Sequence, residues 1–297
     1  MSFSTNVKNE LIANEPEKLC CKKSLLYGMT LFSKEFSFER ISFQSENEGT
    51  AKLFKSLMAE LCNVKCCVKT SPSGKSFTVD IDNTSACSKI MAYFGHSQSE
   101  TSLKINFSNF SCNSCNNLFL AGVFLACGSV SSPEKDYHLE FSVAYLNLSK
   151  SLLTLIRELE LEPKATKRKG YNIIYFKDSE AIEDCLYIMG ASSSMFDMMN
   201  IKIVKEIRNT ANRKANCETA NIEKTVKAAS PQLAAIMKIK KKKGLASLSP
   251  TLREMAEKRL ENPDLSLSEL AELFNPPLSR SGANHRLKRI VEIAEEL

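Results

Sequence analysis

The first 190 residues of the chain contain one pattern twice, at a spacing of 94 to 95 residues. CKKSLLYGMTLFS at residues 21–33 aligns with CNNLFLAGVFLAC at residues 115–127, so that Gly28 falls on Gly122. KSLM at Lys55 aligns with KSLL at Lys150, and IDNTSACSKIMAYFG aligns with FKDSEAIEDCLYIMG. Three separated matches at one spacing predict two copies of a single folding unit.

Each copy is predicted to fold as αββαββα, because helical and alternating patterns follow one another in the same order. Asn83 and Asp178 are typical N-cap residues and predict where the third helix of each copy begins. The expected ranges in the first and second copy are 22–32 and 116–126 for the first helix, 38–46 and 137–145 for the first extended segment, 50–62 and 147–159 for the second helix, and 69–81 and 165–176 for two strands around a turn.

Gly28 and Gly122 lie inside apolar helices, where glycine costs about 1 kcal/mol relative to alanine. Close approach of the two helices, which only glycine permits, would compensate for this cost. We therefore expect the copies, at about residues 20–95 and 115–190, to join through their first helices. The predicted fold class is α+β: two tandem repeats form one pseudo-symmetric domain over residues 1–200, and an all-α domain follows.

The segment LAGVFLACG, residues 120–128, resembles the LAGLIDADG signature of homing endonucleases, whose two αββαββα halves meet through paired helices. In that family an acid before the last glycine of each motif holds the divalent metals that cleave DNA. The matching positions here are Ser33 and Cys127, and the nearest acid to Ser33 is Glu35. Mg²⁺ requires carboxylate oxygens. We expect the fold without catalysis, so no catalytic residue is assigned and the chain is not expected to be an enzyme.

Positive charge is concentrated in the last third of the chain. Residues 201–297 carry 19 Lys and Arg against 12 Asp and Glu, a net charge of +7, whereas the first 200 residues carry −1. This asymmetry is typical of a nucleic-acid-binding tail on a neutral scaffold. We predict a basic helical linker over 201–244 and a DNA-binding domain over 245–297.

The last domain has the pattern of a helix-turn-helix. A helix follows Pro250, SLSE at residues 266–269 forms a capping box, and Asn275-Pro276-Pro277 ends the short second helix. The third helix runs from about Ser281 to Glu296, and its buried stripe is predicted to consist of Ala283, Leu287, Ile290 and Ala294.

Basic and amide side chains cluster at the start of this third helix, which would enter the major groove of double-stranded DNA. A three-helix adaptor for a protein partner is the alternative. The predicted DNA-binding residues are Ser266, Ser279, Arg280, Ser281, Asn284, His285, Arg286, Lys288 and Arg289.

The eleven cysteines predict a reducing, cytoplasmic location and mostly buried thiols. Cys112 and Cys115 have metal-ligand spacing, and Cys20 and Cys21 are a candidate partner pair. Adjacent cysteines chelate poorly, and His96, His138 and His285 are the only histidines that could complete a ligand set. We therefore expect no metal or other cofactor, although binding by these four cysteines stays open. No apolar run reaches the length of a membrane span.

NCETANIEKTV at Asn216 and NPPLSRSGANHRLKRI at Asn275, together with the degenerate LAGLIDADG-like half, closely resemble the WhiA family. The resemblance covers essentially the whole chain. It implies a non-enzymatic, nucleoid-associated DNA-binding regulator of cell division and chromosome segregation, and of sporulation in species that sporulate. A protein partner would bind the scaffold. Alternatives are a division factor that binds DNA without specificity and, less favoured, a residual metal-dependent nuclease.

Overall fold

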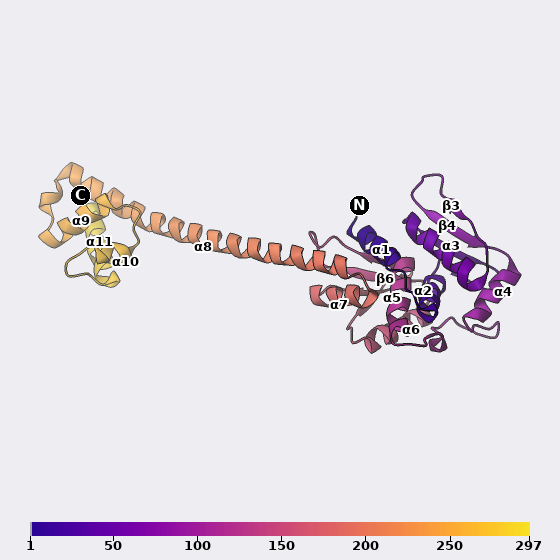
Figure 1. Ribbon diagram of the computed structural model, residues 1–297. Helices are drawn as coiled ribbons and strands as arrows, with labels where there is room; N and C mark the ends of the chain where they lie inside the picture. Colours follow the sequence, from indigo (N-terminus) through magenta and orange to yellow (C-terminus); the bar gives the residue numbers. More distant parts are fainter. Residues whose placement is uncertain (1) are drawn as a thin grey trace. The chain divides into compact units, whose positions relative to one another are not determined.

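The computed structural model describes residues 2–297 and contains two compact units (Figure 1). The first unit ends at Val204, and the second unit is Lys205–Leu297. Helix α8 (Ser192–Lys242) begins in the first unit and ends in the second. Each unit has its own hydrophobic core.

The first unit contains two four-stranded antiparallel sheets with the same topology. Their strand orders are β1-β2-β4-β3 and β5-β6-β8-β7, which confirms the predicted duplication. The strands of the first sheet are β1 (Glu35–Phe36), β2 (Ile41–Ser45), β3 (Val68–Thr70) and β4 (Phe77–Ile81). Those of the second are β5 (Gly128–Val130), β6 (Leu139–Val143), β7 (Lys164–Arg168) and β8 (Tyr171–Phe176).

The alternation seen in the sequence fixes which strand face is buried. Along β6, Leu139, Phe141 and Val143 are buried while the intervening residues are half-exposed. Phe141 pairs with Ile174 of β8, so both side chains enter the core on the same face.

Three helices accompany each sheet in the same order, as predicted. Asn47, Asn83 and Asp178 each accept a hydrogen bond from the third backbone amide of the following helix. The helices are α2 (Leu19–Leu31), α3 (Glu48–Cys62) and α4 (Thr84–Tyr93) in the first copy, and α5 (Ser114–Cys127), α6 (Leu146–Glu158) and α7 (Ser179–Met189) in the second. Helix α1 (Phe3–Ala13), which the sequence analysis did not anticipate, precedes them, and the short η1 (Phe107–Asn109) separates the copies.

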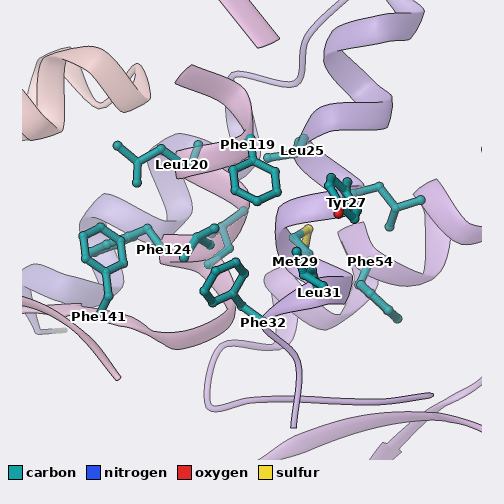
Figure 2. Packing of buried hydrophobic residues seen from close by; sticks show 14 of the residues in the cluster. Leu25, Tyr27, Met29, Leu31, Phe32, Phe54, Phe119, Leu120, Phe124 and Phe141 are labelled. Atoms are coloured by element: carbon teal, nitrogen blue, oxygen red, sulfur yellow. The ribbon is translucent and has the colours of Figure 1, made fainter. Parts of the chain in front are cut away.

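Helices α2 and α5 form the central interface, and their glycines lie at the crossing. A Cβ atom on Gly28 would lie 2.3 Å from the Phe119 carbonyl oxygen, and one on Gly122 would lie 2.2 Å from the Leu25 carbonyl oxygen. Backbone therefore packs on backbone. Figure 2 shows Leu25 and Met29 of α2 in one cluster with Phe119 and Phe124 of α5. Both helices are buried around most of their circumference, which explains why their sequences are apolar on every face.

The second unit packs the end of α8 against η2 (Leu245–Ser247), α9 (Pro250–Glu261), α10 (Leu267–Glu272) and α11 (Arg280–Glu295). Ala235, Ile236 and Ile239 of α8 belong to its core. Part of the segment expected to be a linker, residues 201–244, thus buries apolar side chains of this unit. Among the helices of residues 2–297, none is both long and apolar enough to cross a membrane.

Candidate nucleic-acid interface

Side-chain caps fix the start of the last two helices. The Ser266 hydroxyl accepts from the Glu269 amide, and the Glu269 carboxylate accepts from the Ser266 amide, so the predicted capping box is present. Hydrogen bonding of the Glu269 carboxylate with the side chain and with the backbone amide of Ser266 lowers the pKa of Glu269. At α11 the Ser279 hydroxyl accepts from the Gly282 amide at 3.0 Å. Both serines therefore use their hydroxyls to position helices.

Helix α11 separates a buried stripe from an exposed one. Ala283, Leu287, Ile290 and Ala294 are all buried, as predicted. The opposite face presents the side chains of Ser281, His285, Lys288, Arg289 and Glu292, all of which are exposed. Helical spacing brings these five residues onto one surface stripe.

The charge on this stripe is divided along the helix. Residues 280–289 contain four Lys or Arg and no Asp or Glu, whereas the acids Glu292 and Glu295 follow in the C-terminal half. The cationic half coincides with the helix N-terminus, where the backbone dipole also favours anions. This half of α11 can therefore bind phosphates and present hydrogen-bond donors to base edges.

The predicted binding residues do not all face solvent equally. The Arg286 guanidinium lies 5.6 Å from the centre of the Phe274 ring and is half-buried there, and Asn284 is also half-buried. Arg289 Nη1 contacts Glu292 Oε2 at 2.7 Å. Arg280, Ser281, His285 and Lys288 are exposed. Arg286 thus supports the packing of α11 on the end of α10. The spacing of residues along α11 does not predict this contact, because Phe274 lies outside that helix.

Other cations of this unit hold the helices in place, a role that no pattern in the sequence indicates. Lys258 Nζ donates to the Leu273 carbonyl at 2.7 Å and lies over the Phe274 ring. Lys238 Nζ donates to the Ala294 carbonyl at 2.7 Å, and Lys242 Nζ donates to the Leu297 carbonyl. These last two lysines neutralise the C-terminal end of α11.

The degenerate acid positions of the first unit come together. Ser33 and Cys127 both line a pocket of about 460 Å³, and within residues 2–297 Glu46 is the one acid in its lining. Burial raises the pKa of Cys127 to about 12, so its thiol stays neutral at pH 7. Lys8 lines the adjoining pocket with Cys127 and Glu46, where burial lowers its pKa more than these two groups raise it. Glu35 instead contacts Arg40 at 3.9 Å. The pair of carboxylates that two-metal catalysis requires is thus missing from these positions in the described residues.

Four cysteines also meet in the first unit. The thiols of Cys20, Cys21, Cys112 and Cys115 lie within 4.8 Å of one another. Cys21 and Cys115 are buried, whereas Cys20 and Cys112 are half-exposed. From the sequence alone these two pairs are candidate ligands, and no metal is expected there, although binding stays open.

Comparisons with known proteins match both parts of the chain. The family model of the WhiA LAGLIDADG-like domain matches residues 116–208, and that of the WhiA C-terminal helix-turn-helix domain matches residues 211–294. The chain is similar to the probable cell division protein WhiA of Clostridium botulinum strain Hall, with 38% identity over 100% of this chain and 99% of the relative. It is 37% identical to the relative of the same name from Caldicellulosiruptor saccharolyticus, over 100% and 96% of the two chains.

The crystal structure of full-length DUF199/WhiA from Thermotoga maritima has the same fold. It covers 100% of this chain and 99% of its own chain, with a TM-score of 0.61 and 22% identity. A degenerate LAGLIDADG-like unit, a C-terminal helix-turn-helix and end-to-end similarity to these relatives agree: the chain belongs to the WhiA family.

Proposed function

We propose that this protein is a non-enzymatic, DNA-binding regulator of cell division that acts at the chromosome. The observation that carries the proposal is the cationic N-terminal half of α11, whose exposed face lies opposite the stripe that packs into the core of the second unit. The cell-division names of its full-length relatives support the cellular process. Transcriptional regulation and a link to chromosome segregation are part of this proposal.

In the proposed complex, α11 enters the major groove with its N-terminal end closest to the bases. Recognition helices of this type contact base edges from their first turns. His285 and Arg289 lie on the exposed stripe and supply donors, and Asn284 is at its margin. Arg280 and Lys288 neutralise phosphates. Ser266 and Ser279 contribute by orienting α10 and α11.

The first unit acts in this proposal as a scaffold that binds a protein partner and does not cleave DNA. Ser33 offers a hydroxyl and Cys127 a neutral thiol where metal-dependent cleavage needs carboxylates. A Mg²⁺-dependent nicking assay on supercoiled DNA tests this point. Nicking activity that stays with the protein through further purification would contradict it.

Binding of the full chain to genomic fragments at two salt concentrations tests the DNA-binding role. Arg289→Ala is expected to weaken binding to a selected fragment by about 1–3 kcal/mol if the residue makes a specific contact. Arg253→Ala on α9 is the matched control, because both arginines are similarly exposed and each pairs with one glutamate of its own helix.

Equal affinity of the Arg289→Ala and Arg253→Ala variants would contradict the groove assignment. Binding that ignores sequence and disappears at the higher salt concentration would instead identify a non-specific DNA-binding division factor, since phosphate contacts alone give that behaviour.

A further inference from the structure

We propose that Cys20, Cys21, Cys112 and Cys115 form a tetrathiolate site for one Zn²⁺ ion, which fastens together the N-terminal ends of α2 and α5. None of these four cysteines is among the predicted DNA-binding residues, and none lines the pocket of Ser33 and Cys127. The four sulfur atoms come from two segments about ninety residues apart in the sequence and meet within 4.8 Å.

The three sulfur–sulfur distances from Cys112 are close to those around a single tetrahedral ion, and all four sulfurs lie within 4.8 Å of one another. Zn–S bonds of about 2.3 Å at tetrahedral angles place neighbouring sulfurs about 3.8 Å apart. The Sγ atom of Cys112 lies 3.7 Å from that of Cys20, 3.6 Å from that of Cys21 and 3.5 Å from that of Cys115. An iron–sulfur cluster places several atoms between its cysteine ligands and needs a wider arrangement. The geometry therefore favours a mononuclear ion.

Two disulfides would need the same four residues to form two separate pairs. Cys112 is instead nearly equidistant from three thiols, so no single partner is favoured. All four cysteines are free. Each thiolate of a tetrathiolate zinc site lies near three other sulfurs, and Cys112 lies near three other sulfurs here.

The surrounding backbone suits a negatively charged centre. Cys20 and Cys21 lie in the first turn of α2, and Cys115 lies in the first turn of α5. Neither helix has a side-chain N-cap, so amides at both N-termini are left for other acceptors. Four thiolates and one Zn²⁺ carry a net negative charge, which two helix N-termini stabilise. Half-exposed Cys20 and Cys112 give the ion a route of entry.

The duplication explains what the site would do. Cys21 and Cys115 occupy equivalent positions in the two copies, seven residues before Gly28 and Gly122 respectively. Seven helical residues span about 10 Å. Zinc would hold the two helices together two turns away from the glycine crossing and thereby join the two halves at a second point.

Metal analysis of the full-length protein, purified with a reductant and without chelator, tests the proposal. We expect about one zinc per chain, as a tetrathiolate site requires. Cys112→Ser should lose most of this zinc, and its thermal unfolding should begin at a lower temperature. Cys67→Ser is the matched control, because Cys67 is an exposed member of another adjacent pair, Cys66-Cys67.

Cobalt substitution provides a readout on the unaltered chain, in case the Cys112→Ser variant does not fold. Co²⁺ bound by four thiolates gives intense tetrahedral ligand-field bands and sulfur-to-cobalt charge-transfer bands. Zinc-free wild-type protein that shows no such bands with Co²⁺ would overturn the proposal. So would a count of fewer than the eleven free thiols in the denatured, metal-free protein, since it would reveal disulfides. Iron in place of zinc would overturn the identity of the ion.

Discussion

Replacement of Gly28 by alanine tests whether the two halves depend on backbone contact between α2 and α5. The new Cβ would lie 2.3 Å from the Phe119 carbonyl oxygen and 2.9 Å from the Val123 amide nitrogen, and neither backbone atom can rotate away. Restoring ordinary contact requires the helices to separate by about 1 Å, which forfeits a quarter to a half of each dispersion contact across the interface.

The expected cost follows from these distances. Overpacking of this severity costs about 3–5 kcal/mol, at and beyond the upper end of the usual range. The higher helix propensity of alanine returns about 1 kcal/mol. We therefore expect Gly28→Ala to destabilise the first unit by roughly 2–4 kcal/mol, or to lower its unfolding midpoint by roughly 5–15 °C for a unit of this size.

Thermal and urea unfolding monitored by circular dichroism would measure this change. Gly49→Ala in α3 is the matched control, because its Cβ would meet the ends of the Asn47 and Ile12 side chains at 3.1 and 3.2 Å. That variant is expected to stay within about 1 kcal/mol of the wild type. A Gly28→Ala protein as stable as the Gly49→Ala control would refute the inference of a backbone-to-backbone crossing.

Two further predictions concern the half-buried carboxylate of Asp80 and the buried guanidinium of Arg259. Burial alone would raise the pKa of Asp80, but hydrogen bonds from Ser42 and Arg40 outweigh it and hold that pKa below its usual range. The stabilisation from this carboxylate is therefore present above the ordinary Asp value of about 4 and is lost as the pH falls through the folded-state pKa. Asp80→Asn should lower the free energy of unfolding at pH 7, and the gap in this free energy between the variant and the wild type should shrink in acid. A gap that stays constant across pH in urea unfolding would contradict this account. Arg259 is 1% exposed and donates a hydrogen bond to the Leu265 carbonyl at 2.7 Å. Because Arg259→Ala removes both this bond and buried packing, it should destabilise the second unit by about 2–4 kcal/mol. Unchanged unfolding in calorimetry would show that the buried hydrogen bond is not important.

Much of the fold could be predicted because its signals are local. Asn83, Asp178 and Ser266 begin helices through hydrogen bonds to amides three residues away, and the same three-residue relation is visible in the sequence. The buried stripe of α11 follows from helical spacing alone. Helix α1 was missed because it lies outside both copies and the repeat gave no guide to it.

The candidate site was predictable only in part. Lys288 and Arg289 are exposed because they lie opposite the buried stripe of α11, and helical spacing predicts this. The contact of Arg286 with Phe274 depends instead on how the end of α10 packs against α11. Cys112 and Cys115 showed ligand spacing in the sequence. Their approach to Cys20 and Cys21 required the crossing of α2 with α5.

By itself, the sequence determined the duplication, the order of helices and strands, the capping residues, and the absence of carboxylates at Ser33 and Cys127. These features depend on residue identity and on interactions between near neighbours along the chain. The tertiary structure decided which side chains from distant segments share a space: the thiols at the ends of α2 and α5, the lysines at the end of α11, and the arginine over Phe274. Those contacts depend on how helices cross, and the crossing is set by close packing of whole faces, which no single segment encodes.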